Sequence, residues 1–252
     1  MNSKRQTGWG EIASEYGLAY THDASSYHAA VILPNLMRLV DPKPGKRILE
    51  VGCGDGYFAS AFADSGAVVT GADIAGEMIE QAKRRDPAIA WHVAPGDGLA
   101  FAADASFDAV VIVLALQNIE NLAGTVSEAS RVLVSGGELF VVLNHPTFRI
   151  PKRSSWGWDE ANTTQYRRVD SYLSESRQEI DMDPGSQGVK RTTISFHRPL
   201  QVYVKTLSKF GFVVIGLEEW ISHKESEKGG RSEAENRARK EFPLFMMLRA
   251  RK

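Results

Sequence analysis

The sequence has few of the features that mark secreted, membrane-bound or nucleic-acid-binding proteins. One cysteine among 252 residues excludes an internal disulfide framework and favours a reducing compartment, so we expect a cytoplasmic protein. A formal net charge of −1 provides no broad positive field for nucleic acid or an anionic membrane. No apolar run approaches the roughly 20 residues that cross a bilayer, and the N-terminal residues lack the apolar core of a secretory signal. The composition is otherwise ordinary for a globular protein, with 43% hydrophobic and 24% charged residues.

The length of the chain suits one domain with insertions. We expect a single domain over residues 1–252, divided into an N-terminal cap (1–44), a ligand-binding core (45–143), an insertion (144–196) and a C-terminal part of the sheet (197–252).

Residues 48–57, Ile-Leu-Glu-Val-Gly-Cys-Gly-Asp-Gly-Tyr, predict a buried strand, a glycine-rich turn and the start of a helix. The glycines let the backbone pass close to a ligand, and the helix N-terminus leaves N–H groups unpaired beside it. A turn of this kind also occurs without a ligand, and in nicotinamide dehydrogenases. Glu50 and Asp55 would repel a pyrophosphate, and they suit a ligand that carries a cation.

Strands and helices then alternate. Strands are predicted at 48–51, 68–74, 88–93, 107–116 and 138–143, with helices at 57–65, 76–85 and 122–134 between them. The nearly continuous apolar run at 107–116 is typical of a central parallel strand. This alternation predicts a doubly wound parallel sheet, whose ligands bind at the carboxyl ends of the strands. Asp73 ends one strand 21 residues after Gly52, a spacing at which an acid can bind ribose hydroxyls, although a surface acid is the simpler alternative.

Glu50–Gly56 closely resembles the first motif of class I S-adenosylmethionine-dependent methyltransferases, and Gln117–Ile119 resembles their fourth. Residues 197–220 resemble the ubiquinone-methylating branch of small-molecule methyltransferases, so the resemblance runs from about Arg47 to the end. It implies an α/β fold with a Rossmann-like seven-stranded sheet, an antiparallel last strand, N-terminal cap helices and an insertion after the fifth strand. It also implies S-adenosyl-L-methionine as cofactor, S-adenosyl-L-homocysteine as product, and in-line methyl transfer to O, N, S or C of a small molecule.

The resemblance implies a set of cofactor-binding residues at the strand ends, with Asp97 beside the adenine amino group and Gly98 allowing close approach. The expected set is Tyr20, Glu50, Gly52, Cys53, Gly54, Gly56, Asp73, Ile74, Met78, Gly96, Asp97, Gly98, Leu114, Ala115 and Asn118.

In the insertion, regular patterning lapses from residue 144 until about Thr192. Its aromatic and arginine residues suit a lid over the methyl acceptor, but a homodimer contact or a packed structural loop would use the same residue types. RNA stacking is disfavoured by the acids within the segment and by the neutral chain.

A general base is needed when the acceptor is a hydroxyl or a protonated amine. The candidates are His145, which directly follows a strand, then His28, Tyr166 and His197. No cluster of histidine, cysteine and acidic residues has metal-ligand spacing, so we expect no metal. A non-catalytic cofactor-binding or scaffold subunit, with the insertion as a protein interface, is the alternative.

Overall fold

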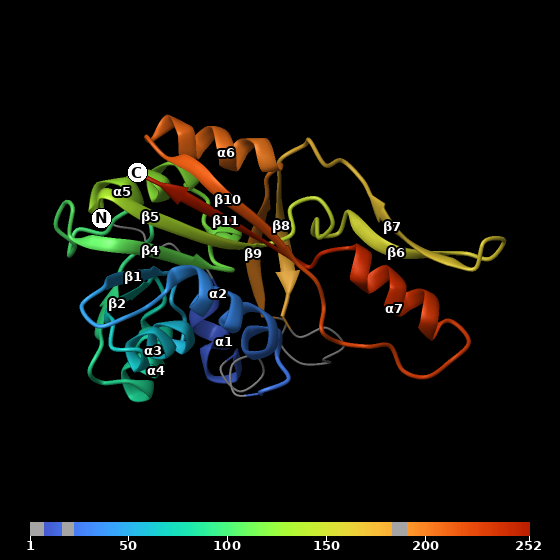
Figure 1. Cartoon of the computed structure of the whole chain (residues 1–252), viewed down its shortest axis with the longest axis horizontal. Coiled ribbons are helices and arrows are strands. Elements are labelled where there is room, and N and C mark those ends of the chain that lie inside the picture. The colour runs from blue at the N-terminus through green and yellow to red at the C-terminus, as the bar shows by residue number, and fades with distance from the viewer. Residues whose placement is uncertain (1–7, 17–22, 183–190) are drawn as a thin grey trace.

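The computed structural model describes residues 8–16, 23–182 and 191–252. One seven-stranded sheet forms the centre, with helices on both of its faces (Figure 1). The strands are β1 (Arg47–Val51), β2 (Val68–Asp73), β3 (Ala90–Val93), β4 (Phe107–Val113), β5 (Leu133–Asn144), β10 (Val213–Trp220) and β11 (Phe245–Arg251). Their order in the sheet is β10-β11-β5-β4-β1-β2-β3.

The sheet is parallel except at one strand. β1 pairs in parallel with β2 and β4, and β4 pairs in parallel with β5. β11 lies antiparallel between β5 and β10. The predicted α/β fold, with its antiparallel last strand, is therefore confirmed.

Helices cover the two faces of the sheet and create two separate cores. The helices are α1 (Trp9–Tyr16), α2 (Leu33–Val40), α3 (Tyr57–Asp64), α4 (Gly76–Arg85), α5 (Leu122–Val132), α6 (Leu200–Lys209) and α7 (Ser232–Glu241). Phe62 of α3 and Leu36 of α2 pack in the core on one face, and Val126 of α5 and Leu207 of α6 pack in the core on the other. The central strand β4 is buried on both faces, as its apolar run predicts.

The helical segment before β1 has two parts, and Pro34 lies close to their junction. Residues His28–Ile32 (η2) form a π-helical turn before α2 begins at Leu33. Proline has no N–H, so it cannot donate to a carbonyl of the preceding turn. In the π-helical turn the Leu33 N–H donates to the His28 carbonyl five residues back, and the Asn35 side chain donates to the Val31 carbonyl at 2.9 Å. The chain thus passes the proline without ending the helix.

The insertion is more regular than its sequence indicates. It forms two β-hairpins, β6 (Ser154–Asp159) with β7 (Thr164–Val169), and β8 (Ser176–Asp181) with β9 (Thr192–His197). The lapse in patterning indicated an irregular segment, and that expectation was wrong, because the segment contains paired strands. β6, β7 and β8 expose much of their surface and carry few apolar residues, so they lack the clear alternation that marks a half-buried strand.

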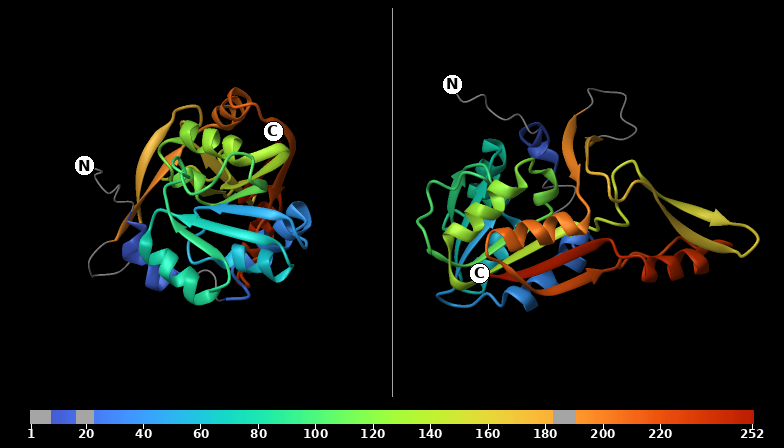
Figure 2. Two further views of the ribbon diagram at one scale, coloured as in Figure 1. Left: turned by 90° about the vertical axis from the view of Figure 1, so that its left-hand side faces the viewer. Right: turned by 90° about the horizontal axis from the view of Figure 1, so that it is seen from above.

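The two hairpins lie in different places. β6 and β7, with α7 beside them, project from the core as an arm (Figures 1 and 2). In the arm the Arg231 guanidinium lies 4.5 Å from the centre of the Trp158 ring and pairs with Glu160 at 2.6 Å. The β8–β9 hairpin instead stands at the carboxyl edge of the sheet beside α1 (Figure 2). Only this second hairpin is near the strand ends where a ligand is expected.

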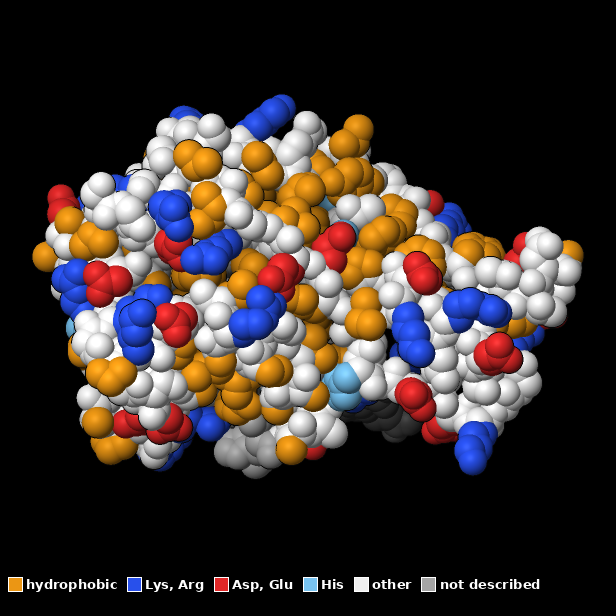
Figure 3. All heavy atoms as spheres, viewed as in Figure 1, with side chains coloured by type: hydrophobic (Ala, Val, Ile, Leu, Met, Phe, Trp, Pro, Cys, Tyr) orange, Lys and Arg blue, Asp and Glu red, His pale blue; other side chains and the backbone are white. Residues whose placement is uncertain are grey.

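On the face seen in Figure 3, acidic and basic side chains are interspersed. Ion pairs between described residues include Arg131 with Asp104 at 2.7 Å and Arg249 with Glu138 at 2.8 Å. No helix among the described residues has the length and apolar character needed to cross a membrane.

Candidate functional site

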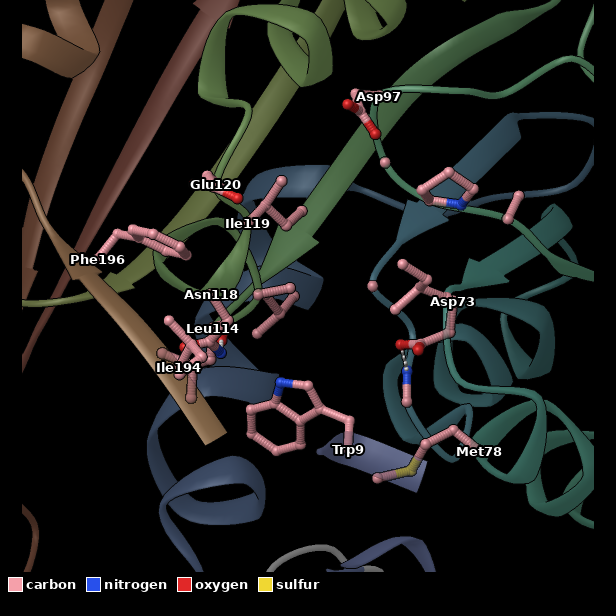
Figure 4. A pocket seen from close by; sticks show the side chains of 18 of the residues that line it. Trp9, Asp73, Met78, Asp97, Leu114, Asn118, Ile119, Glu120, Ile194 and Phe196 are labelled. Atoms are coloured by element: carbon pink, nitrogen blue, oxygen red, sulfur yellow. Dashed lines mark hydrogen bonds between the residues drawn. The ribbon is translucent and has the colours of Figure 1, made fainter. Parts of the chain in front are cut away.

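A cavity opens at the carboxyl ends of β1, β2 and β4, where the sequence predicts a ligand (Figure 4). It is lined by Trp9, Gly52, Gly54, Asp73, Ile74, Met78, Ala94, Pro95, Gly96, Asp97, Val113, Leu114, Ala115, Asn118, Ile119, Glu120, Arg177, Ile194 and Phe196.

The glycine turn after β1 forms one wall of this cavity. Gly52 and Gly54 adopt φ angles of 72° and 54°, in the left-handed region that favours glycine. A Cβ added to Gly52 would lie 2.4 Å from the Cβ of Ala115 at the tip of β4. Glycine therefore allows the two strand tips to approach closely, and it leaves the backbone exposed to the cavity.

Asp73, the last residue of β2, ties the turn to the neighbouring strand. One carboxylate oxygen accepts the Gly54 N–H at 3.0 Å and the other accepts the Ala75 N–H at 2.9 Å. The side chain is 9% exposed, and burial raises its pKa from the ordinary value. Asp73 thus fixes the conformation of the turn and presents an acceptor group to the cavity.

The two other acids of the turn do not line the cavity. Glu50 is 1% exposed, one of its oxygens has no hydrogen-bond partner, and burial raises its pKa well above the usual range. Asp55 is also buried, and it pairs with the Arg85 guanidinium at 2.5 Å. The carboxylates in the lining are Asp73, Asp97 and Glu120, so the expected direct role of Glu50 and Asp55 beside a cation is not supported by their positions.

The tip of β4 forms the opposite wall and carries a strained residue. Leu114 has a φ of 52°, which is uncommon for a residue other than glycine. Its carbonyl accepts hydrogen bonds from the side chains of Gln117 at 2.9 Å and Asn118 at 3.1 Å. Such strain often occurs where a backbone is shaped for a ligand.

Asp97 lies on the loop after β3, at the far side of the cavity from Trp9 (Figure 4). The Asn121 side-chain amide donates to its carboxylate at 2.7 Å. Asn121 also caps α5, since its side-chain oxygen accepts the Gly124 N–H at 3.0 Å. The position of Asp97 is therefore set by the start of the following helix.

Two segments outside the predicted core close the remaining sides. The Trp9 indole of α1 points into the space between Asn118 and Asp73, and Ile194 and Phe196 of β9 face it from the hairpin (Figure 4). Figure 2 shows α1 beside this hairpin.

The loop after β4 is held by one buried arginine. Arg198 is 6% exposed and donates to the carbonyls of Ile119 at 2.9 Å and Glu120 at 2.7 Å. Its guanidinium lies 5.1 Å from the centre of the Phe196 ring. Arg198 therefore fixes the loop against the hairpin that covers it.

Most of the expected cofactor-binding residues meet in this cavity. Those in its lining are Gly52, Gly54, Asp73, Ile74, Met78, Gly96, Asp97, Leu114, Ala115 and Asn118. Glu50, Cys53, Gly56 and Gly98 lie outside the lining, and Tyr20 falls outside the described residues. Cys53 is buried, and burial raises the pKa of its thiol well above the usual range, so it is not poised as a nucleophile.

His145, the first candidate base, makes hydrogen bonds at both ring nitrogens. Its Nδ1 accepts the N–H groups of Thr147 at 3.2 Å and Phe148 at 3.3 Å. The ring proton is then on Nε2, which donates to Glu219 at 2.7 Å. His145 follows β5, which lies outside the three strands whose ends form the cavity, and its ring turns toward β10 instead.

The other candidate bases are also absent from the lining. His28 is buried against Phe58, with ring centres 5.7 Å apart, and burial lowers its pKa. His197 bonds the Tyr172 carbonyl at 2.7 Å, and Tyr166 lies on the arm with 47% of its surface exposed. The described lining contains no histidine, tyrosine or cysteine.

Sequence reasoning missed the walls that come from distant segments. Trp9, Arg177, Ile194 and Phe196 reach the cavity only because α1 and the β8–β9 hairpin fold over the strand ends. Nothing local in their sequence indicates this placement. Ile119, in contrast, belongs to the predicted segment Gln117–Ile119, and Glu120 directly follows it. Extending that segment by one residue would have included both.

Comparison with known proteins is consistent with this geometry. A family model described as a methyltransferase domain matches residues 49–141. The chain is 36% identical over 133 residues to a demethylmenaquinone methyltransferase of Tropheryma whipplei, covering 51% of this chain and 52% of that protein. It is 33% identical over 134 residues to a ubiquinone/menaquinone biosynthesis C-methyltransferase of Zymomonas mobilis, covering 51% and 54%. The chain thus spans about half the length of these curated relatives.

A solved structure extends the likeness beyond this half. The crystal structure of an S-adenosylmethionine-dependent methyltransferase from Mesorhizobium loti superposes with a TM-score of 0.68 at 26% identity, covering 87% of this chain and 96% of that one. This superposition includes most of the residues of the chain that do not align with the curated relatives. Residues 49–141 thus match a methyltransferase domain, and the sheet order and fold of the chain are similar to those of a solved S-adenosylmethionine-dependent methyltransferase.

Proposed function

We propose that this protein transfers a methyl group from S-adenosyl-L-methionine to a small-molecule acceptor and releases S-adenosyl-L-homocysteine. The observation that carries the proposal is the convergence of the glycine turn, Asp73, Asp97 and the tip of β4 on one cavity. These elements come from four separate loops, and their meeting at one edge of the sheet is what a nucleoside-sized ligand requires.

The residues present fit this cofactor. Asp73 can accept hydrogen bonds from two adjacent ribose hydroxyls, and Ile74 and Met78 provide apolar surface beside it. Asp97 can accept from an adenine amino group, and Gly96 lets its loop pack closely, because a Cβ there would lie 3.1 Å from Ile119 and from Val51. The turn at Gly52 and Gly54 leaves backbone groups facing the cavity for the methionine end.

Bound S-adenosylmethionine would supply an electrophilic methyl group, and the protein has to align an acceptor with it and exclude water. Trp9, Ile194 and Phe196 cover the cavity and can exclude water from it. Glu120 is exposed at its edge, and it is the lining carboxylate best placed to accept a proton, because Asp73 already binds two backbone amides. A second cavity adjoins at Glu120, Arg177 and Phe196, so an acceptor has an open approach. That approach favours an enzyme over a scaffold subunit.

The names of the relatives suggest the first acceptors to test. Two relatives, each matched over about half of its length, are named a demethylmenaquinone methyltransferase and a ubiquinone/menaquinone biosynthesis C-methyltransferase. We therefore propose a hydroxylated aromatic ring as the acceptor. The purified chain is incubated with methyl-labelled S-adenosylmethionine and reduced 1,4-naphthoquinone, 4-hydroxybenzoate or 1-hydroxy-2-naphthoate. Acceptor-dependent formation of S-adenosylhomocysteine and a labelled product is expected. If neither forms with any acceptor of this class, the assignment of the acceptor is wrong. A homodimer stays a prediction that size-exclusion chromatography with light scattering can check.

A further inference from the structure

A second cavity lies directly beside the first, on the other side of Phe196. It is an open cavity lined by the β8–β9 hairpin, the start of α5 and the first turns of α6, and its volume of about 510 Å³ is within the range of small-molecule sites. It shares Glu120, Arg177 and Phe196 with the first cavity. We propose that this second cavity receives the methyl acceptor, that the acceptor is an aromatic ring with an anionic substituent, and that Arg177 binds this anionic group. The inference rests on the proposed methyl transfer.

Arg177 has the position and the free donors that such a role requires. It stands directly opposite Phe196 in the register of β8 and β9, so both side chains project from the same face of the hairpin. It is exposed, and within the described chain its side chain makes no hydrogen bond or ion pair with another residue. Its guanidinium can therefore offer a planar set of donors to a carboxylate.

Arg198 adds a second positive charge, which a carboxylate approaches only at the limit of an ion pair. Its hydrogen bonds to Ile119 and Glu120 go to backbone carbonyls, which carry no net charge. Its ion pair with Glu175 is long, with Nε 4.0 Å from the carboxylate oxygen, and the Glu175 side chain is 60% exposed. A buried cation of this kind raises the potential in the adjoining cavity, because interactions are stronger where water is excluded.

The acidic side chains of the second cavity are more exposed to solvent than Arg198. Glu120 and Glu175 both line this cavity, and both are exposed to solvent. Water screens their charges more than that of Arg198, which is 6% exposed. A cationic acceptor would have to approach two guanidiniums, whereas an anionic one can bind Arg177 directly. The charges that line this cavity therefore favour an anionic acceptor.

The apolar part of the lining fits the ring of the acceptor. Phe196 stands between the two cavities, while Leu122 and Val202 line the second one. A ring that lies against Phe196 can direct one edge to Arg177 and another toward Leu114 and Asn118 in the first cavity. A hydroxylated aromatic carboxylate combines the two requirements.

The test compares acids with their methyl esters, which keep the ring and remove the charge. The full chain is saturated with S-adenosylhomocysteine, and its binding of 4-hydroxybenzoate and 1-hydroxy-2-naphthoate is measured by calorimetry against that of each ester. The wild type is expected to bind each acid roughly 10- to 100-fold more tightly than its ester. Arg177→Gln should abolish this preference, and Arg177→Lys should keep part of it. Arg168→Gln is the matched control, since Arg168 lies on a strand of the other hairpin, and it should behave as wild type.

Each alternative outcome overturns the inference. Equal binding of acid and ester by the wild type, or no binding of any pair at millimolar concentration, would exclude an anionic aromatic acceptor. A preference that survives in Arg177→Gln would exclude Arg177 as the anchor. Because S-adenosylhomocysteine is titrated first on every variant, these failures are separate from a failure of the proposed cofactor chemistry, which would appear as no binding of S-adenosylhomocysteine by the wild type.

Discussion

Asp73 has two tasks, because it holds the glycine turn through two backbone N–H groups and also lines the cavity. Asp73→Asn keeps the shape of the side chain but removes its charge and one acceptor. The loss of a charge-assisted hydrogen bond costs about 1.5–3 kcal/mol, so affinity for S-adenosylhomocysteine should fall roughly 10- to 100-fold. Calorimetry measures this, with Asp64→Asn at the exposed end of α3 as the control. Unchanged affinity in Asp73→Asn would show that the ribose is held elsewhere.

Glu50 is a buried acid in β1 whose charge state affects the stability of the fold. Burial raises its pKa well above the ordinary 4.5, so the folded protein holds this proton more tightly than the unfolded chain. The contribution of Glu50 to the free energy of unfolding is therefore complete at a pH below its ordinary pKa. It is lost as the pH rises through the raised pKa of the folded protein. Glutamine does not titrate, and its oxygen can still accept the Ala59 N–H that now bonds the carboxyl.

Glu50→Gln should therefore gain stability relative to wild type as the pH rises. Urea unfolding of both proteins at pH 5 and pH 8 measures the difference in free energy of unfolding. We expect a larger advantage, or a smaller deficit, for the variant at pH 8. Glu120→Gln, at an exposed site, should show no such trend. A difference between wild type and Glu50→Gln that is independent of pH would mean that Glu50 titrates normally in the fold.

At the scale of elements, the loop after β4 and the β8–β9 hairpin form one unit joined by Arg198. Arg198→Met would leave buried carbonyls without donors, at a cost of about 1.5–3 kcal/mol. For a chain of this length the midpoint of thermal unfolding should fall by about 3–12 °C. Differential scanning calorimetry measures the shift, and Arg168→Met serves as the control, because the Arg168 side chain is 66% exposed. If the midpoint falls equally in the two variants, Arg198 does not join the loop after β4 to the β8–β9 hairpin.

The same elements show where sequence reasoning works. β4 was predictable because its seven residues are nearly all apolar and four of them are Val or Ile, which favours a strand buried on both faces. β7 was not, because Thr-Gln-Tyr-Arg-Arg-Val has little apolar surface and is stabilised by its partner strand and by neighbouring side chains, such as Arg167 above Trp156 at 5.0 Å. The turn at Gly52 was recognisable from local residues, whereas the walls at Trp9 and Phe196 depend on contacts between distant segments.

For the whole molecule, the sheet order explains why Asp73 lines the cavity and His145 does not. Parallel strands β1, β2 and β4 end at the same edge, so residues at their tips meet without further information. His145 also follows a strand, but β5 lies between β4 and the antiparallel β11, and its end contacts the start of β11 through the bond from the His145 N–H to the Leu244 carbonyl at 2.9 Å. Which strand ends form the site depends on the order of the strands, which the residues near His145 do not encode.

The central claim is that this cavity holds S-adenosylmethionine, and titration of the full chain with S-adenosylhomocysteine by calorimetry tests it most directly. Reduced nicotinamide adenine dinucleotide is titrated in parallel, because dehydrogenases use a similar glycine turn. The structure predicts saturable binding of one S-adenosylhomocysteine per chain, and no binding of the dinucleotide. Absence of S-adenosylhomocysteine binding at millimolar concentration, or tighter binding of the dinucleotide, would contradict the account.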